Sequence, residues 1–156
     1  MSEQRTAGEA PPIYSIGHSN HPLDMLLALL RQHGIDVLAD VRSAPYSKYC
    51  PQFDKPELEA AVRKAGFQYV YLGRELGGRP EGAEYYDSEG YVLYWRRAES
   101  PEFLSGIERL ERGRDQYRIA LLCSEEDPAG CHRALPVHWL QVNSLHLEDD
   151  PAWTLG

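Results

Sequence analysis

The sequence predicts an α/β fold: one domain in which a mostly parallel sheet of about five strands carries helices on both faces. The chain has 156 residues, of which 42% are hydrophobic and 26% charged, which suits a single globular domain with a real core. From residue 13 onward, short apolar runs alternate with segments whose apolar residues recur at helical spacing. This alternation is typical of a three-layer, Rossmann-like arrangement with a parallel sheet.

The predicted strands are short apolar runs that follow turn or helix-stop signals. They cover residues 13–16, 35–41, 67–72, 117–123 and 144–147. The run at 117–123 is the most strand-like segment of the chain, and we expect it inside the sheet. The flanking residues 1–12 and 150–156 are predicted tails, which leaves residues 13–149 as the single domain.

The predicted helices are recognised by their first residues and by the glycines that stop them. They begin at or next to Pro22, Asp54, Ser100 and Pro128. The first three end at Gly34, Gly66 and Gly113. The fourth reaches about residue 143, with Pro136 as an awkward interior residue. We predict a glycine-rich loop at 73–80 and a long aromatic excursion at 81–99.

Net charge, apolar runs and cysteine content indicate which partners and which cellular location to expect. The formal net charge of −8 argues against tight, non-specific binding of duplex DNA. Residues 1–12 lack an apolar stretch or a cleavage signal, and no apolar run is long enough to cross a membrane. The chain has three cysteines, an odd number, and it is large enough to fold without disulfides. We therefore expect reduced thiols, no disulfide and a cytoplasmic location.

The predicted strands leave their polar residues on one edge of the sheet. In open parallel sheets, ligands bind beyond the carboxyl ends of the strands. We expect the strand order third, second, first, fourth, fifth, which makes the loops after the first, second and fourth strands neighbours. His18, Arg42 and Arg133 follow these strands and should border one pocket.

Three residues are candidates for catalysis. His18 follows a strand and a glycine, where it is placed to act as a general acid or base, or simply to close a turn. Cys131 and His132 lie near the start of the fourth predicted helix, where the helix dipole favours a lowered thiol pKa. Whether Cys131 is a nucleophile or a buried structural thiol stays open at this stage.

A second group is predicted to hold an anion. Arg42 at the exit of the second strand and Arg133 in the fourth helix are candidate anion clamps. For Arg42 the alternative is an ion pair with Asp40, and for Arg133 a pair with Glu125 or its acidic neighbours. The remaining candidates are polar residues of the same predicted edge: Ser19, Ser43, Tyr46, Arg74 and Glu125.

The sequence offers little support for a metal site, a nucleotide-binding loop motif or a base-stacking surface. The spacing of Cys123 and Cys131 matches no common zinc pattern, so we predict no metal, and no cofactor is identified. The loop at 73–80 is neither a phosphate-binding Walker loop nor a dinucleotide fingerprint. The aromatic and basic residues of 81–99 suit base stacking, although a lid packed on the sheet is the commoner arrangement.

Four motifs together resemble a known family. They are Ser15 to Ser19; Asp40 to Ser43 with Pro45 and Ser47; Tyr71 to Gly73 leading to Leu76 to Gly78; and Leu121 to Cys123 with Glu125 and Cys131 to Arg133. The chain from about residue 13 to 147 resembles domain-of-unknown-function family 488. This resemblance implies a bacterial or archaeal α/β domain, and marks His18, Arg42, Cys131, His132 and Arg133 as positions of interest. It implies no particular reaction.

These observations favour a small cytoplasmic enzyme, a hydrolase or transferase that acts on a phosphorylated or nucleotide-like anion. Two alternatives remain. One is a non-catalytic module that binds a nucleotide or single-stranded nucleic acid. The other is a structural or interaction domain in which the polar edge has no ligand.

Overall fold

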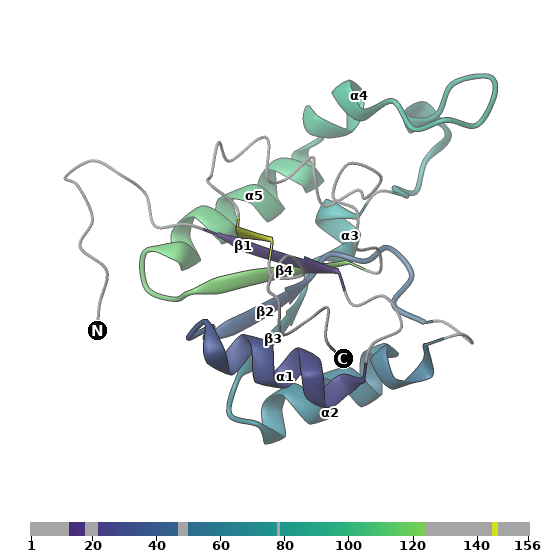
Figure 1. Cartoon of the computed structure of the whole chain (residues 1–156). Coiled ribbons are helices and arrows are strands. Elements are labelled where there is room, and N and C mark those ends of the chain that lie inside the picture. Colours follow the sequence, from purple (N-terminus) through teal and green to yellow (C-terminus); the bar gives the residue numbers. More distant parts are fainter. Residues whose placement is uncertain (1–12, 18–21, 47–49, 78, 124–144, 147–156) are drawn as a thin grey trace.

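Five parallel strands form the centre of the protein in a computed structural model, which describes residues 13–17, 22–46, 50–77, 79–123 and 145–146 (Figure 1). The strands are β1 (Tyr14–Gly17), β2 (Val37–Asp40), β3 (Gln68–Tyr71), β4 (Ile119–Cys123) and β5 (Leu145–His146). Every pairing between them is parallel. The α/β class and the five-stranded parallel sheet predicted from the sequence are therefore confirmed, and the run at 117–123 lies inside the sheet.

The strand order differs from the predicted one. The sheet runs β3-β2-β4-β1-β5, so β4 lies between β2 and β1. The expectation that β1 neighbours β2 is wrong. Residues Ile119 to Leu122 of β4 are all buried, as a central strand with helices on both faces requires. Apolar periodicity marks a segment as a strand but does not say which strand lies beside it.

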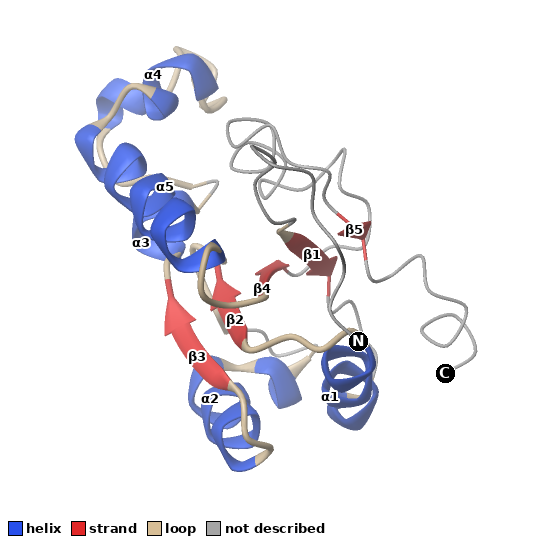
Figure 2. Ribbon diagram, turned by 90° about the vertical axis from the view of Figure 1, so that its left-hand side faces the viewer, coloured by secondary structure: helices blue, strands red, loops and turns tan. Residues whose placement is uncertain are grey.

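Helices cover both faces of the sheet, as Figure 2 shows from the side. One face carries α1 (Leu23–Gln32) and α2 (Lys55–Lys64), and the short helix η1 (Pro51–Phe53) precedes α2. The other face carries α3 (Gly73–Leu76) and α5 (Pro101–Arg114). The turn η2 (Ala83–Tyr85) and α4 (Tyr94–Ala98) belong to residues 81–99, which project beyond α3 and α5 (Figure 1). This segment does not lie over the sheet as a lid would.

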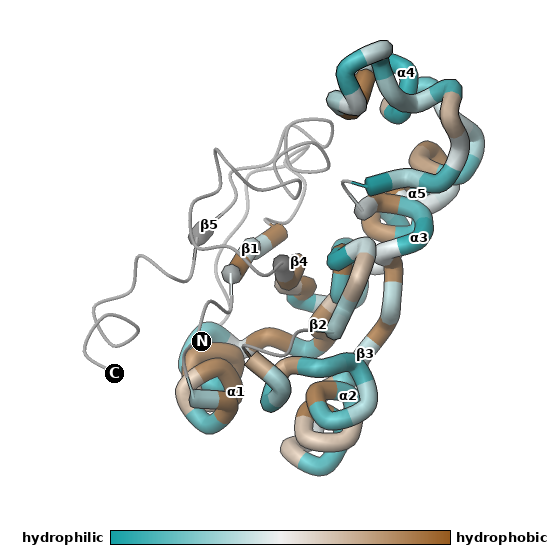
Figure 3. Tube along the Cα trace, turned by 90° about the vertical axis from the view of Figure 1, so that its right-hand side faces the viewer, coloured by the Kyte–Doolittle hydropathy of each residue, from teal (hydrophilic) through white to brown (hydrophobic). Residues whose placement is uncertain are grey.

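The alternation of side chains along each strand creates two hydrophobic layers. Val37 and Ala39 of β2 pack with Phe103 and Ile107 of α5, whereas Leu38 packs with Leu26 of α1 on the opposite face. Successive residues of a strand point to opposite faces, so a strand between two helical layers must be apolar on both. Figure 3 shows the apolar residues gathered in the strands and along the inner sides of α1 and α2.

The boundaries of the first three predicted helices agree with their signals to within a residue or two, and the fourth, predicted from Pro128 to about residue 143, lies outside the described residues. Gly34 and Gly66 follow α1 and α2 with φ angles of 67° and 97°, which residues other than glycine rarely adopt. Ser100 caps α5, because its hydroxyl accepts the Phe103 N–H at 3.2 Å. Asp54 occupies the capping position of α2, but its side chain forms no capping hydrogen bond. No helix in the described part of the chain is long and apolar enough to cross a membrane.

Candidate functional site

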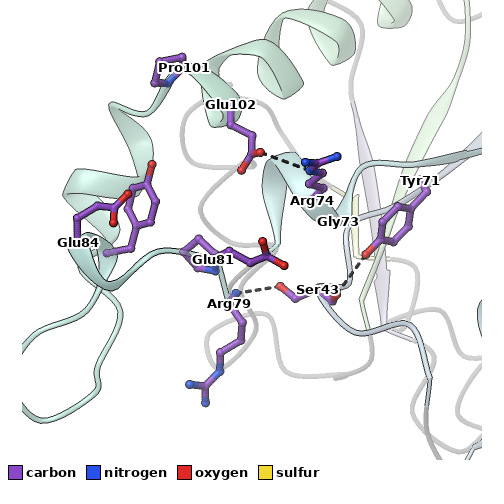
Figure 4. Close-up of a pocket in the computed structure, with 11 residues that line it drawn as sticks. Ser43, Tyr71, Gly73, Arg74, Arg79, Glu81, Glu84, Pro101 and Glu102 are labelled. Atoms are coloured by element: carbon purple, nitrogen blue, oxygen red, sulfur yellow. Dashed lines mark hydrogen bonds and ion pairs between the residues drawn. The ribbon is translucent and has the colours of Figure 1, made fainter.

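A cavity of about 620 Å³ lies beyond the carboxyl ends of β2 and β3. Figure 4 shows its lining, which comes from three regions: the loop after β2, the end of β3 with α3, and residues 79–102. The lining residues are Ser43, Tyr71, Gly73, Arg74, Arg79, Pro80, Glu81, Glu84, Tyr85, Pro101 and Glu102. The volume falls within the range of small-molecule sites, and the position is the usual ligand side of an open parallel sheet.

The floor of the cavity depends on a close approach between the chain after β2 and the start of α3. A Cβ atom on Gly73 would lie 1.9 Å from the carbonyl oxygen of Arg42, so only glycine fits at this position. The Tyr71 hydroxyl donates to the Arg42 carbonyl at 2.7 Å and lies 3.2 Å from the Ser43 carbonyl. The predicted loop at 73–80 begins as the short helix α3. Gly73 lets the backbone of this helix pack closely against the backbone of Arg42.

Arg74 presents an exposed guanidinium at the cavity wall, where it forms an ion pair with Glu102. Its Nε atom lies 3.7 Å from a carboxylate oxygen of Glu102, and 78% of its side chain is accessible to solvent. Glu102 also accepts from Arg97 at 3.0 Å, and the Arg97 side chain is 1% exposed. The buried Arg97 thus holds Glu102 in place, and Glu102 in turn orients Arg74 at the cavity.

Asp40 and Arg42 form a buried ion pair at the end of β2. The two residues are two positions apart, so in extended chain they lie on the same side. Arg42 Nε and Nη2 each donate to Asp40 at 2.8 Å, and the Arg42 backbone N–H donates at 3.1 Å. The Arg42 side chain is 5% exposed and the Asp40 side chain is fully buried. The structure therefore contains the ion pair that the sequence offered as the alternative to an anion clamp.

Two tyrosines of β3 complete this cluster. The Tyr69 hydroxyl donates to Asp40 at 2.6 Å, and Lys55 lies 5.8 Å from the centre of the Tyr69 ring and 5.6 Å from that of Tyr71. Burial, followed by the charge of Asp40 and the hydrogen bond to it, raises the pKa of Tyr69 well above its usual range. Burial and the Asp40 charge also raise the pKa of Tyr71.

The raised pKa of Tyr69 predicts a loss of stability at alkaline pH. A tyrosine that stays protonated in the folded state while it ionises in the unfolded state stabilises the fold fully below about pH 10, and less as the pH rises above it. We expect Tyr69→Phe to remove up to about 1.4 kcal/mol per pH unit of this alkaline slope. Urea unfolding between pH 8 and 11 measures it. Tyr117→Phe is the control, because the Tyr117 residue is 39% exposed; equal slopes in both variants would contradict the assignment.

The structure brings some predicted site residues to the cavity and places others elsewhere. Ser43 and Arg74 line it. Tyr46 is 60% exposed and is not among the lining residues. Arg42 lies in the buried ion pair, and its contact with an anion stays a prediction. Six candidates lie outside the described residues: Ser19, His18, Glu125, Cys131, His132 and Arg133.

Because His18 and Arg133 lie outside the described residues, the predicted meeting of His18, Arg42 and Arg133 stays a prediction. The strand register bears on it. Gly17 pairs with Cys123, and the Val41 N–H donates to the Leu122 carbonyl. The carboxyl ends of β1, β4 and β2 are therefore level. Because β4 separates the other two, the loops after β1 and β2 start about 10 Å apart.

Several lining residues escaped the sequence analysis. Arg79 stood in the predicted loop after the third strand, so its position was a usable signal. Glu81, Glu84 and Glu102 had none, because they reach the cavity only through the path of residues 81–99 and the packing of α5. Of the cysteines, Cys50 carries a reduced thiol. In the described part of the chain, no group of three histidine, cysteine or acidic residues could hold a metal ion.

Comparison with known proteins identifies a family but no characterised relative. No curated protein and no solved structure matches the chain. The model of the family described as Domain of unknown function DUF488 matches residues 22–140, most of the chain and all of the described cavity lining. The motifs that suggested this resemblance include the end of β2 and the segment around α3, which build the cavity floor. The chain belongs to the DUF488 family.

Proposed function

We propose that the protein is an enzyme that binds a small phosphorylated or nucleotide-like anion in the cavity beyond β2 and β3. The observation that carries this proposal is the position of Arg74, an exposed guanidinium at a cavity of about 620 Å³ on the ligand side of the sheet. One guanidinium group can donate two parallel hydrogen bonds to two oxygens of the same phosphate or carboxylate. Ser43 supplies a hydroxyl at the same wall.

The catalytic residues of this proposal come from the loops after β1 and β4, which leave the same edge of the sheet as the loop after β2. His18 follows the end of β1 and would act as acid or base, while Cys131 and His132 follow β4 in the chain. Arg133 would add a second contact to the anion. Hydrolysis of, or group transfer from, a phosphate-containing substrate is the reaction class that these residue types support. A cytoplasmic location belongs to the same proposal.

One feature favours a second candidate, a non-catalytic module that binds a nucleotide. Tyr85 lines the cavity, and an aromatic ring at an anion site suits the stacking of a base. Trp95 lies on the same segment and is 58% exposed, with Arg96 4.8 Å from its ring centre. Substrate turnover separates the two candidates, since a binding module leaves its ligand unchanged.

Thermal unfolding with inorganic phosphate, AMP and ADP tests the binding. At ligand concentrations about ten times Kd we expect about 1.4 kcal/mol of stabilisation, which corresponds to a rise of roughly 3–5 °C in Tm. Arg74→Gln should abolish the rise. Arg112→Gln is the matched control, because the Arg112 side chain is 77% exposed and pairs with Glu108 on α5. A rise that survives Arg74→Gln would contradict the site.

Arg42→Ala is unsuitable for this test, because it leaves the buried Asp40 without its guanidinium. Turnover is measured by mass spectrometry on a broad mixture of phosphorylated metabolites, with and without added divalent metal. Loss of a substrate and appearance of its product support an enzyme. Stabilisation by ligand without any turnover supports the binding module instead.

A further inference from the structure

The cavity wall carries charges of both signs. Among the described lining residues, Arg74 and Arg79 are cationic, whereas Glu81, Glu84 and Glu102 are anionic. A site that bound only a dianionic phosphate would gain nothing from three carboxylates, because each repels the ligand. The lining therefore contains more information about the ligand than the presence of an arginine alone.

One of the three carboxylates is already balanced. Glu102 accepts from the buried Arg97 at 3.0 Å and lies 3.7 Å from Arg74, so it belongs to the scaffold that orients Arg74. Glu81 and Glu84 differ from it. Within the described part of the chain, no hydrogen bond or ion pair joins either carboxylate to another side chain. Both residues are exposed at the cavity.

The charges are also separated in space. Figure 4 shows Arg74 and Ser43 on the side of the cavity near Tyr71, with Glu84 on the opposite side and Glu81 between them. The Arg79 side chain points away from the other labelled groups, and its backbone N–H donates to the Ser43 hydroxyl at 2.9 Å. The cavity thus has a cationic side at Arg74 and an acidic side at Glu84.

We propose that the cavity selects zwitterionic ligands, in which an amine accompanies the phosphate or other anionic group. This inference rests on the proposed function and specifies its substrate class. The anionic group binds at Arg74 and Ser43, and the ammonium group lies towards Glu81 and Glu84. The amine replaces a repulsion between ligand and carboxylates with an attraction, so charge complementarity sets the preference.

Matched pairs of ligands test this preference by isothermal titration calorimetry of the full chain. One series consists of ω-aminoalkyl phosphates with two to six carbons, and the other of alkyl phosphates of the same lengths. We expect the best aminoalkyl phosphate to bind about fivefold tighter than its alkyl partner at low salt. The preference should shrink with added sodium chloride, because exposed charges are screened.

Variants assign the preference to the acidic side. Glu84→Gln should reduce the ratio of the two affinities towards one while it leaves alkyl phosphate binding unchanged or slightly tighter. Arg74→Gln should weaken both series. Glu89→Gln is the control, since Glu89 is an exposed acid of the same segment and does not line the cavity; it should preserve the ratio.

The outcomes separate this inference from the proposed function. If both series bind with equal affinity and Arg74→Gln weakens both, the anion site stands and the zwitterion preference is overturned. If the alkyl phosphates bind more tightly than the aminoalkyl phosphates, the preference is likewise overturned. If neither series nor the nucleotides bind, the anion site itself fails, and the preference fails with it.

Discussion

Asp40→Asn should destabilise the protein by about 3–5 kcal/mol, because it leaves the guanidinium of Arg42 buried without a counter-charge. The Arg42 side chain is 5% exposed, and three of the hydrogen bonds at Asp40 come from Arg42 itself. The Tyr69 hydroxyl loses a carboxylate acceptor in the same variant. Equilibrium unfolding in urea at pH 7 measures the free energy of unfolding.

Glu59→Gln provides the comparison for Asp40→Asn. Glu59 pairs with Lys55 at 3.4 Å and with Arg63 at 3.0 Å, in side chains that are about one third or more exposed. Exposed pairs of this kind contribute about 0.2–1 kcal/mol. A similar loss in both variants would contradict the interpretation of Asp40 and Arg42 as a buried, mutually dependent pair.

A double variant, Asp40→Leu with Arg42→Met, should recover much of the stability, since no charge is then buried alone.

Arg97→Ala should cost about 3 kcal/mol or more and should also impair ligand binding at the cavity. The Arg97 guanidinium donates to the Arg74 carbonyl at 2.8 Å, to the Glu75 carbonyl at 2.6 Å and to Glu102 at 3.0 Å. Each buried acceptor that loses its partner costs about 1–3 kcal/mol. The same hydrogen bonds connect residues 81–99 to α3 and α5. Without them, neither the Glu102 side chain nor the segment that carries Glu84 is held in position at the cavity.

The neighbouring Arg96 makes a close control for Arg97. It is exposed, donates to the Glu84 carbonyl at 2.9 Å and lies over the exposed Trp95 ring. We expect Arg96→Ala to change the free energy of unfolding by less than about 1 kcal/mol. Urea unfolding measures stability, and titration with the phosphate ligands measures the site. Equal effects of the two substitutions would show that burial of Arg97 contributes nothing beyond its charge.

The candidate site divides between what chain order could indicate and what it could not. Ser43 and Arg74 were found because each follows a predicted strand, and in a parallel sheet such residues must reach the same edge. Arg42 also follows a strand, but its side chain turns back to Asp40, two residues earlier. Position at an edge therefore does not reveal whether a charged group faces a ligand or another side chain.

The acidic side of the cavity shows the limit most clearly. Glu81 and Glu84 lie in a segment with little apolar period, and its path depends on the contacts of Arg97 with α3. These contacts join residues more than twenty positions apart in the chain. Local patterns contain no information about such partners.

By itself, the sequence determined the class of fold, the number of strands and the approximate ends of the first three helices. The reason is that apolar periodicity and glycine stops act within a few residues of each other. Only the tertiary structure decided that β4 lies between β2 and β1, because strand neighbours are chosen by packing on both faces of the sheet. The same packing decided that Arg42 pairs with Asp40 and that Arg74 faces the cavity opposite Glu84.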